Sequence, residues 1–566
     1  MSLSEQEIIR REKLEKLKQL GIDAFPAAEY KISDSTKSIK QNFQEGKKVV
    51  IAGRLMSRRI QGKASFADLQ DSEGKIQVYF NRDEICPGED KTLYNEVYKH
   101  LLDIGDIIGV EGELFKTQVG EMTVKVENFT LLTKSLRPLP LPKVDAEGNI
   151  FDAFNDPELR YRQRYADLIV NPHVKEIFVK RTKLFNAMRS FFNDAGYFEV
   201  ETPILQSIPG GAAARPFITH HNALDIPLYL RIANELYLKR LIVGGFDGVY
   251  EFSKNFRNEG MDRTHNPEFT AMEIYVAYKD YNWMMDFTEK LLEFCARAVN
   301  GTSDSTFGEH TISWKAPYPR ISMTEAILKY TGFDITGKSQ EELFDFAKSI
   351  GVEVDETMGK GKLIDEIFGE KCEGNFIQPT FITDYPIEMS PLTKKHRSKD
   401  GLTERFELIV CGKEIANAYS ELNDPIDQRK RFEHQLALSE NGDDEATGFI
   451  DEDFLRALEY GMPPTSGLGI GMDRLIMFLT NNASIQEVLF FPQMRPERAE
   501  TKVELGEDEK VILEILNSQE APFELNEVKN RSQLSGKKWD KASKTLAKNN
   551  LVKVEKIDEV LWMKLV

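Results

Sequence analysis

At 566 residues the chain exceeds the size that one hydrophobic core usually supports, so two to four domains are expected. Its 41% hydrophobic and 29% charged residues are ordinary for a globular protein and exclude the disordered and collagen-like classes. The longest apolar runs, at 241–245 and 475–479, are far shorter than the ~20 residues that cross a bilayer, and no apolar signal segment opens the chain. We therefore expect a cytoplasmic protein with no membrane partner.

The charge is unevenly distributed along the chain. A net charge of −18 disfavours a nucleic-acid partner for the chain as a whole, because phosphates attract clustered Lys and Arg. Two stretches depart from that average: residues 53–63 hold four cations and no acid, and residues 527–556 hold nine Lys and Arg against three acids. Each stretch is either a nucleic-acid contact or a solvated charged face.

Residues 1–150 are predicted to form a helix followed by a small barrel. Apolar residues at helical spacing over 4–20 end at Gly21, which is typical of a helix C-terminus. From 48 to 133, short alternating runs separated by Gly and Asp predict about five strands. This favours an OB-fold, whose open face binds single-stranded oligonucleotides. Phe66 is either a base-stacking ring on that face or a core residue.

Residues 151–504 are predicted to form a mixed α and β domain, and residues 505–566 a separate module. A proline-containing link at 136–144 precedes the domain, and a predominantly helical insertion occupies 320–400. The module shows three helical stretches and then a two-stranded ribbon, which is the order of elements in a winged helix.

The stretch at 256–269, FRNEGMDRTHNPEF, carries many charges of both signs although predicted strands flank it. Side chains alternate along a strand, so the two strands turn one polar face toward a common surface away from the core. The residues on that surface are Arg257, Glu259, Phe269, Glu273 and Tyr275. A planar cation beside an aromatic ring suits a ligand site better than a solvated sheet face.

Two further segments point to the same site. Residues 189–205 predict a helix that ends at Gly196 and then an edge strand containing Pro203, an element suited to pairing two subunits. Residues 467–479 alternate glycines and then begin a helix that carries Arg474. Glycine lets a backbone approach a ligand closely, and arginine pairs with phosphate.

These three segments, in this order, resemble motifs 1, 2 and 3 of the class II aminoacyl-tRNA synthetases, and residues 1 to about 500 resemble the bacterial-type, lysine-specific members. The stretches at 210–225, 230–246, 256–269 and 420–432 are distinctive of the lysine group. The resemblance implies an α+β protein, with an N-terminal OB-fold for the anticodon and a catalytic antiparallel sheet of six to seven strands flanked by helices. It implies a homodimer that forms lysyl-adenylate from L-lysine and ATP and then transfers lysine to tRNA(Lys).

The resemblance also implies a role for individual residues. Arg257 would be the catalytic residue that bridges the lysine carboxylate and the α-phosphate of ATP. ATP would be held by Arg257, Glu259, His265, Asn266, Phe269, Glu407 and Arg474. Lysine would be held by Gly211, Glu235, Arg257, Tyr275, Asn417, Tyr419 and Glu421, with Glu235 and Glu421 facing the side-chain ammonium. Mg²⁺ would be held by Glu407 and Glu414, and the anticodon by Arg59, Phe66 and Gln77.

Two local features bear on these roles. If Cys411 and Gly412 form a two-residue turn, Glu407 and Glu414 lie on one face of a hairpin, where carboxylates suit Mg²⁺. Tyr419 stands where many relatives have Phe, and its hydroxyl needs a partner if it is buried.

Three rival functions share parts of this pattern. An aspartyl- or asparaginyl-tRNA synthetase shares the barrel and the motifs, but its substrate does not match paired acids at Glu235 and Glu421. A ligase that adds lysine to a translation factor would lack the barrel, and a regulatory paralogue would have lost Arg257, Glu414 or Arg474. The module after 505 lies outside the resemblance: added tRNA affinity is our preferred hypothesis, and protein docking or dimer support is the alternative.

Overall fold

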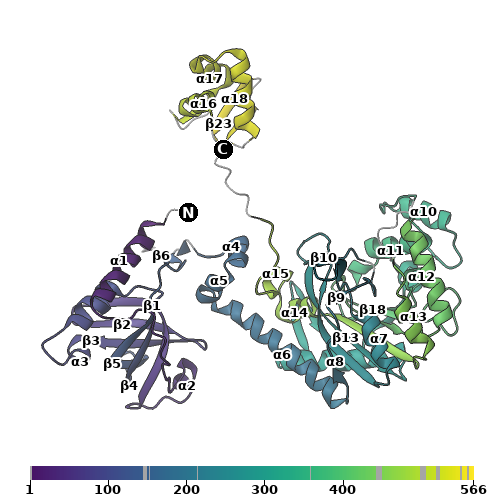
Figure 1. Cartoon of the computed structure of the whole chain (residues 1–566), viewed down its shortest axis with the longest axis horizontal. Coiled ribbons are helices and arrows are strands. Elements are labelled where there is room, and N and C mark those ends of the chain that lie inside the picture. Colours follow the sequence, from purple (N-terminus) through teal and green to yellow (C-terminus); the bar gives the residue numbers. More distant parts are fainter. Residues whose placement is uncertain are drawn as a thin grey trace. The chain divides into compact units, whose positions relative to one another are not determined.

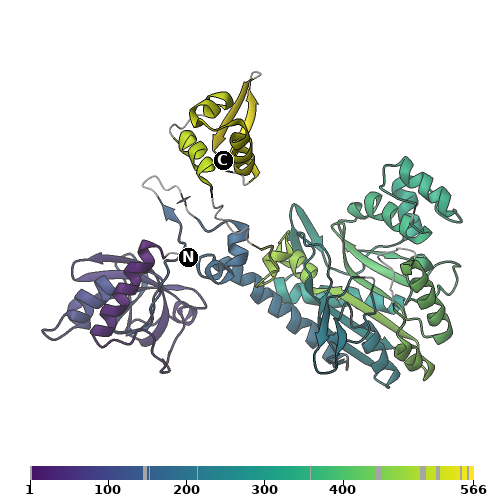
Figure 2. The ribbon, with the colours of Figure 1, turned by 45° about the horizontal axis from the view of Figure 1, so that its top comes forward.

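The computed structural model describes residues 3–144, 150–151, 153–212, 214–356, 358–440, 449–496, 505–517, 523–548, 551–557 and 560–565. The chain divides into two compact units, residues 1–493 and 494–566 (Figures 1 and 2). Among the described helices, none combines the length and the apolar character needed to cross a lipid bilayer.

The first unit begins with a helix and a closed five-stranded barrel. Helix α1 (Glu5–Gln19) starts at Ser4, whose hydroxyl accepts a hydrogen bond from the Glu7 amide, and the chain turns at Gly21 with φ +73°. The barrel has the strand order β1-β2-β3-β5-β4. Its strands are β1 (Lys48–Gln61), β2 (Ala64–Gln70), β3 (Lys75–Asn81), β4 (Ile107–Lys116) and β5 (Met122–Thr133). The predicted helix and barrel are therefore confirmed.

Three short helical segments accompany the barrel, and its core is aliphatic and aromatic. The segments are α2 (Thr36–Gln41), α3 (Arg82–Ile85) and the π-helix η1 (Leu93–Leu101). Burial alternates along β2 and β3, as expected for strands with one face inside a barrel. The inward residues include Leu69, Val78, Tyr98, Val110 and Val126.

An eight-stranded sheet forms the centre of the rest of the first unit, in the order β16-β17-β18-β19-β20-β13-β12-β8. The strands are β8 (Phe198–Glu199), β12 (Gly248–Phe256), β13 (Glu268–Ala277), β16 (Arg320–Ser322), β17 (Thr380–Thr383), β18 (Arg405–Val410), β19 (Lys413–Ser420) and β20 (Thr465–Gly471). The predicted antiparallel arrangement holds in the centre. The sheet exceeds the expected six to seven strands because a short strand pairs in parallel at each edge, β8 with β12 and β16 with β17.

Long helices cover one face of this sheet, and the other face is left for the site. Helices α6 (Pro172–Asp194), α8 (Tyr281–Asn300) and α14 (Met472–Thr480) enclose the largest core with side chains from β13 and β20 such as Met272, Ile274, Leu468 and Ile470 (Figure 1). The intervening residues of the same strands point the other way.

Shorter elements surround these layers. They are α4 (Pro157–Arg162), α5 (Arg164–Val170), α7 (Glu235–Val243), α12 (Pro425–Glu440), α13 (Glu452–Glu459), α15 (Ile485–Val488), the two-stranded sheets β6 (Lys143–Val144) with β7 (Ile150–Phe151) and β14 (Asp304–Phe307) with β15 (His310–Ser313), and the sheet β10-β11-β9 of Ile218–His221, Ile226–Leu230 and Leu205–Gln206. Pro203 lies between β8 and β9, so the single edge strand expected there is two short strands in different sheets.

The segment between β16 and β17 forms a helical subdomain with its own core. It consists of α9 (Met323–Thr331), α10 (Gln340–Ser349) and α11 (Lys360–Lys371), followed by the short 3₁₀ turn η2 (Glu373–Asn375). The core includes Ile327, Leu343, Ile364 and Phe368. The predicted helical insertion at 320–400 therefore also contains two strands of the main sheet, β16 at its start and β17 after its helices, and a second short 3₁₀ turn, η3 (Ile387–Met389), follows β17.

The second unit is small and has a separate core. It contains α16 (Glu507–Asn517), α17 (Leu525–Ser532) and α18 (Gly536–Lys548), and a sheet in the order β21-β23-β22 of Phe523–Glu524, Val560–Leu565 and Val552–Ile557. Side chains from all three helices and from the sheet pack together, among them Ile512, Val528, Trp539, Leu546 and Met563.

Candidate active site

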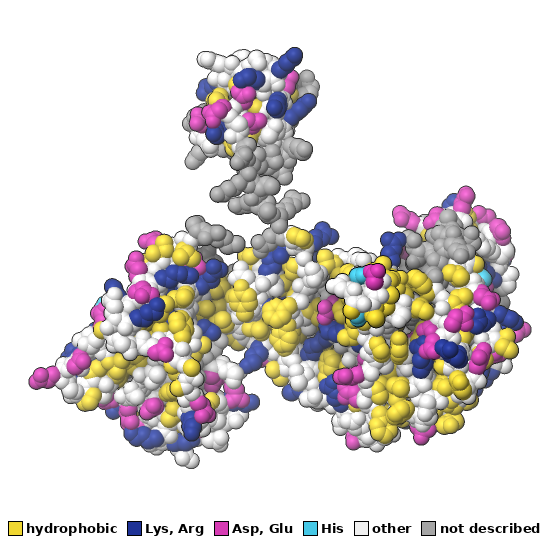
Figure 3. Space-filling view, in the orientation of Figure 1, with side chains coloured by type: hydrophobic (Ala, Val, Ile, Leu, Met, Phe, Trp, Pro, Cys, Tyr) yellow, Lys and Arg dark blue, Asp and Glu magenta, His cyan; other side chains and the backbone are white. Residues whose placement is uncertain are grey.

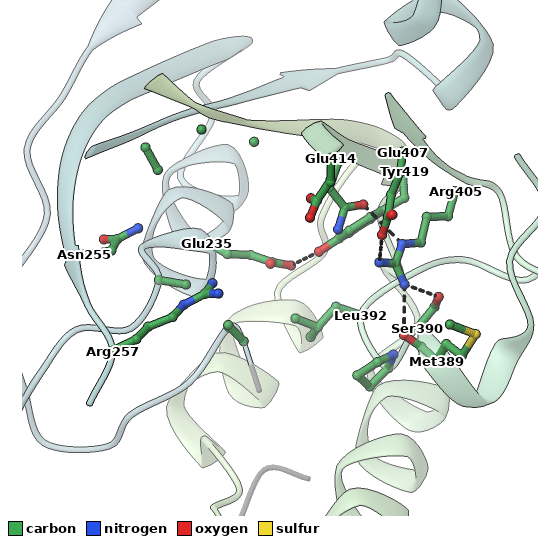
Figure 4. Close-up of a pocket in the computed structure, with 18 of the residues that line it drawn as sticks. Glu235, Asn255, Arg257, Met389, Ser390, Leu392, Arg405, Glu407, Glu414 and Tyr419 are labelled. Atoms are coloured by element: carbon green, nitrogen blue, oxygen red, sulfur yellow. Dashed lines mark hydrogen bonds and ion pairs between the residues drawn. The ribbon is translucent and has the colours of Figure 1, made fainter. Parts of the chain in front are cut away.

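A cavity of about 1230 Å³ opens on the face of the main sheet opposite α6 and α8. Strands β12, β13, β18, β19 and β20, the start of α7 and the start of α14 contribute to its lining (Figure 4). Every residue predicted to bind lysine, ATP or metal lines this cavity except Glu421, which is only 1% exposed and lies beneath it. Residues that are far apart in the sequence are thus brought into one site.

Arg257 occupies the middle of the cavity, just after the end of β12. Its guanidinium carbon lies 5.1 Å from the centre of the Phe269 ring. Asn255 is paired with Phe269 across β12 and β13, and Arg257, two residues after Asn255, lies on the same face. Figure 4 shows the guanidinium directed toward Glu235. The Nε of Arg257 is buried and has no hydrogen-bond partner among the described residues. A buried donor without a partner is costly, so this group is suited to an acceptor on a ligand.

At one end of the cavity an internal lysine is held between two acids. Lys239 follows Glu235 by one turn of α7 and is fully buried. Its ammonium lies 2.5 Å from Glu235 Oε1 and also forms an ion pair with Glu421. Burial would lower the pKa of Lys239, but the two carboxylates outweigh it and raise the pKa above its usual value. The hydroxyl of Tyr419 donates a hydrogen bond of 2.8 Å to the same oxygen of Glu235.

The two acids keep acceptor capacity for a further cation. Oε1 of Glu421 is buried and has no hydrogen-bond partner among the residues that the structure describes. Figure 4 shows the carboxylate of Glu235 reaching into the open part of the cavity, with the bond from Tyr419 on one side. An ammonium has three donors and no acceptor, so it is the type of group that these oxygens can bind.

A third acid, Glu273, lies beside this pair. It is buried on β13 and accepts a 3.0 Å hydrogen bond from the Tyr275 hydroxyl. Burial and the charge of Glu235 raise the pKa of Glu273 to about 8. Burial also raises the pKa of Glu421 well above its usual value, and the charge of Lys239 opposes that shift. Three acids share one internal ammonium at this end of the cavity, so a second ammonium, on a ligand, would be stabilised there.

Two glycines make room for this arrangement. A side chain at Gly467 would place its Cβ 2.2 Å from Glu421 Oε1 and 2.5 Å from the Tyr275 ring, so only glycine lets these groups meet there. Gly211 has φ +88°, and its Cβ would lie 3.1 Å from that of Ala233, next to Glu235. The glycine at 467 thus serves the protein's own side chains, whereas the sequence predicted close approach of a ligand.

The predicted ATP residues meet at the opposite end of the cavity. Arg474, in the first turn of α14, lies 3.1 Å from His265 Nε2 through one guanidinium nitrogen and donates a 2.9 Å bond from the other to the carbonyl of Glu414. His265 is exposed and is held from its other ring nitrogen by Asp262 at 2.8 Å. The amide of Asn266 donates to the carbonyl of Glu268 at 2.5 Å. Glu259 is exposed on the same loop.

The β18–β19 hairpin carries the two predicted metal ligands. Cys411 and Gly412 form its two-residue turn, with φ of 48° and 64°, and a bulge shifts the register after Leu408. Both Glu407 and Glu414 nevertheless line the cavity. Burial and the charge of Glu414 raise the pKa of Glu407 to about 7.

The chemistry of this pair fits a divalent cation. Carboxylate oxygens are the ligands that Mg²⁺ prefers, and it usually keeps water and substrate phosphate in its remaining positions. No cluster of three or more His, Cys, Asp or Glu suited to a metal occurs in the described part of the chain. Two carboxylates supply only part of the ligands of Mg²⁺, so Glu407 and Glu414 fit a cation that is shared with a phosphorylated ligand.

Arg405 is a half-buried residue that contacts side chains at both ends of the site. It donates to Asn417 Oδ1 at 3.1 Å and to Glu407 at 2.6 Å (Figure 4). The carbonyl of Met389 accepts another of its hydrogen bonds, at 2.9 Å. The hydroxyl of Ser390 accepts a fourth, at 3.0 Å. A rigid guanidinium with four acceptors fixes the orientation of Asn417 and Glu407.

The three residues predicted to read the anticodon lie on one face of the barrel. Arg59 on β1 is paired directly with Phe66 on β2, and Asp68 on β2 is paired with Gln77 on β3. Arg59 is exposed, whereas Phe66 and Gln77 are half-buried. The Phe66 ring lies 5.0 Å from that of Tyr79, which belongs to the same face. A cation beside two partly open rings is an arrangement that can bind unstacked bases.

The predicted site residues did not include Lys239, Glu273 or Arg405. A Glu and a Lys four residues apart on one helix are visible in the sequence, and this spacing is a signal for Lys239. Strand alternation already placed Glu273 on the correct face. Arg405 shares its strand face with Glu407, which is the corresponding signal.

Comparison with known protein families agrees with this geometry. Residues 156–495 match the family described as tRNA synthetases class II (D, K and N), and residues 49–132 match the family described as OB-fold nucleic acid binding domain. The first match covers the main sheet and its insertion, and the second covers the barrel.

Individual relatives are similar over most or all of the chain. A lysine–tRNA ligase of Christiangramia forsetii is 76% identical over 563 residues, which cover 100% of this chain and 98% of that protein. One of Porphyromonas gingivalis is 68% identical over 503 residues, covering 88% of this chain and 87% of that protein. One of Azobacteroides pseudotrichonymphae is 64% identical over 499 residues, covering 88% of this chain and 99% of that protein.

Proposed function

Because the chain belongs to the lysine–tRNA ligases of the class II aminoacyl-tRNA synthetase family, we propose that it activates L-lysine with ATP and transfers it to tRNA(Lys). In the first step the lysine carboxylate attacks the α-phosphorus, which gives lysyl-adenylate and pyrophosphate. In the second step the 3′-terminal ribose hydroxyl attacks the lysyl carbonyl, and AMP leaves. The observation that carries this proposal is the buried acid cluster at Glu235 and Glu421, next to Arg257.

Arg257 is the catalytic residue of the first step. Its planar guanidinium can hold the lysine carboxylate and the α-phosphate at the same time, which brings nucleophile and phosphorus together and offsets charge in the transition state. The partnerless Nε and the position over Phe269 support this role. The adenine ring stacks on Phe269. The rest of the nucleotide is held by Glu259, His265 and Asn266, and its terminal phosphate is bound by Arg474.

Specificity for lysine comes from the acids at the end of the cavity that contains Lys239. Glu235 and Glu421 bind the side-chain ammonium, and Tyr275, Asn417 and Tyr419 line the aliphatic part of the substrate. A neutral amino acid leaves buried carboxylate oxygens without a donor, which is expensive, and an acidic one adds repulsion. Gly211 leaves space for the α-amino group next to Glu235.

Glu407 and Glu414 are proposed to hold Mg²⁺. When bound, it would neutralise phosphate charge during adenylation. Burial and the charge of Glu414 raise the pKa of Glu407, and Arg405 donates a hydrogen bond to Glu407 that fixes its orientation.

The barrel is proposed to bind the anticodon of tRNA(Lys) with Arg59, Phe66 and Gln77. The OB-fold family match and the shared face of the three residues support this assignment. Because tRNA charging supplies translation, we place the protein in the cytoplasm.

A homodimer is proposed from apolar surface around β8. A polar monomer rarely exposes many large apolar side chains in one region. Eight are exposed between 198 and 246: Phe198, Ile204, Leu205, Ile208, Ile218, Leu224, Ile226 and Phe246. The sheet β10-β11-β9 brings several of them onto neighbouring strands, and the Phe198 and Phe246 rings lie 5.8 Å apart. Sedimentation equilibrium should give a dimer for the wild type and a monomer for Phe198→Asp; a monomeric wild type would overturn the assignment.

The activity is tested by pyrophosphate exchange into ATP with each of the twenty amino acids. We expect exchange with lysine alone, and its loss in Glu235→Gln. Glu459→Gln, an exposed glutamate on α13, serves as the matched control and should exchange like the wild type. Exchange driven by another amino acid would contradict the assigned substrate, and no exchange would contradict the reaction.

A further inference from the structure

The second unit, residues 494–566, contains none of the residues assigned above to the cavity or to the anticodon face. Its core is closed by Ile512, Val528, Trp539, Leu546 and Met563. The alignment with the Azobacteroides pseudotrichonymphae relative covers nearly all of that protein but leaves a part of this chain unmatched, and this part is about as long as the unit. A lysine–tRNA ligase therefore exists without a counterpart to this length of chain.

One face of α18 in this unit is a stripe of lysines. Lys537, Lys541 and Lys544 are exposed and are four and three residues apart, so they lie above one another on the helix. Two residues along an α-helix correspond to a turn of about 200°, so the buried Trp539 and Leu546 lie on the opposite side of α18. The lysine face thus points directly away from the core, and in the sequence Lys548 continues the same spacing.

These lysines differ from three other cations of the unit, which have carboxylate partners. Lys510 forms an ion pair with Glu507 at 2.8 Å, Lys538 with Asp508 at 3.3 Å, and Arg531 with Glu527. Within the described ranges of the chain, no ion pair involves Lys537, Lys541 or Lys544. Like charges at this spacing repel one another, so the stripe does not serve the stability of the helix.

The stripe also departs from the charge of the rest of the chain. Residues 505–566 contain eleven Lys and Arg and eleven Asp and Glu, so the whole excess of 18 acids lies in the first 504 residues. Three of these acids, Glu507, Asp508 and Glu509, stand at the start of α16, whereas α18 has a single acid, Asp540. Figure 3 shows several Lys and Arg side chains (dark blue) on the visible face of this unit.

From this surface we propose that the lysine face of α18 binds the phosphate backbone of the tRNA that the catalytic unit charges. The inference rests on the proposed function, which supplies a polyanionic substrate to a chain that is otherwise acidic. Lysine is a flexible point charge without the planar geometry that reads base edges, so the contact favours phosphates and does not depend on sequence. The stripe from Lys537 to Lys544 extends about 10 Å along the helix, enough to meet more than one phosphate.

The test compares two full-length variants that lose the same charge. The first, Lys537→Gln/Lys541→Gln/Lys544→Gln, removes the stripe; the second, Lys510→Gln/Arg531→Gln/Lys538→Gln, removes paired cations elsewhere on the unit. Binding of a fluorescent tRNA(Lys) transcript is measured by anisotropy between 50 and 200 mM salt (on the order of the range over which phosphate contacts weaken). We expect the stripe variant to bind about tenfold more weakly or worse, with a salt slope lower by about 2 to 3, and the control to match the wild type.

Further readouts separate the alternatives. A transcript of unrelated sequence should lose the same factor, because phosphate contacts are independent of sequence. Unchanged affinity and salt slope in the stripe variant would overturn the proposal; if that variant instead shifts the oligomeric state in sedimentation, the stripe docks protein. Lysine-dependent pyrophosphate exchange needs no tRNA, so it should be unaffected in both variants. Absence of exchange in the wild type would refute the ligase assignment itself, independently of the stripe.

Discussion

Lysine plays opposite parts in two regions of this molecule. Lys239 is fully buried between Glu235 and Glu421, whereas Lys541 is exposed on α18 with no ion-pair partner among the described residues. A buried charge is tolerated only with fixed partners, so Lys239 is committed to the protein's own acids. An exposed lysine keeps its hydration and its freedom, and it is available to a polyanion. Burial therefore decides whether a cation organises a site inside the protein or is available to bind a partner.

The largest expected effect comes from removing the buried lysine. Lys239→Met leaves Glu235 and Glu421 as uncompensated buried charges, and breaking such a pair costs about 3–5 kcal/mol. We expect a much lower urea midpoint for residues 1–493. The fraction of the variant that folds should show no lysine-dependent pyrophosphate exchange.

Two controls sharpen this prediction. Lys541→Met makes the same substitution on an exposed helix and should change stability by no more than about 0.5 kcal/mol. Adding Glu421→Gln to Lys239→Met removes one unpaired charge and should recover part of the lost stability. If Lys239→Met is as stable as the wild type, the buried ion pairs are not the organising feature of this end of the site.

The next largest effect is expected at Arg257, where the planar shape of the guanidinium is proposed to matter as well as its charge. Arg257→Lys keeps the charge but loses the planar fork, so we expect the rate of pyrophosphate exchange to fall about 100-fold or more. Arg429→Lys makes the same change at an exposed ion pair with Glu452 and should stay within about twofold of the wild type. An unaffected rate in Arg257→Lys would mean that a point charge suffices there, as on α18.

A good part of the site could be predicted from the sequence, because local geometry determines it. Strand alternation predicted that Phe269 and Tyr275 share a face, and the turn at Cys411 and Gly412 predicted that both hairpin acids point into one cavity. These inferences use only the period of a strand and the length of a turn.

The rest depends on contacts between distant parts of the chain. The spacing of Glu235 and Lys239 is visible on one helix, but the sequence does not reveal that Glu421 meets them and that all three are buried. The parallel pairing of the predicted edge strand, through β8, was also missed, as was the strand β16, because β8 and β16 have only two and three residues. Tertiary contacts create such short strands, and they leave no periodic signal.

A smaller effect is a pH dependence of the KM for lysine, which we expect from the buried acid Glu273. The pKa of Glu273 is raised to about 8, so it is protonated at neutral pH and ionises as the pH rises. The ionised form attracts the substrate ammonium, so the KM for lysine should fall between about pH 7 and 9, by at most about tenfold per pH unit. The raised pKa also means that this group stabilises the fold most below its unfolded-state pKa of 4.5 and loses that contribution as the pH passes 8.

Glu273→Gln supplies the control for the pH effect. It cannot ionise, so its KM for lysine should show a flatter dependence between pH 7 and 9. Glu273 belongs to the cavity on the main sheet and not to α18, so tRNA affinity should show no matching change. A wild-type profile as flat as that of Glu273→Gln would contradict the assignment.

The smallest effect concerns a single hydroxyl at the edge of the buried network. Tyr419 donates a 2.8 Å hydrogen bond to Glu235 Oε1, an oxygen that Lys239 also contacts. In Tyr419→Phe the oxygen keeps its ionic partner and the ring keeps its shape, so only about 1 kcal/mol is at stake, which is about fivefold in the KM for lysine. The kcat of exchange should stay within about twofold, and the control Tyr460→Phe, at an 84% exposed tyrosine, should change neither value. A large loss in Tyr419→Phe would mean that Lys239 alone does not hold Glu235 in place, and the buried lysine would then share its organising role with the hydroxyl.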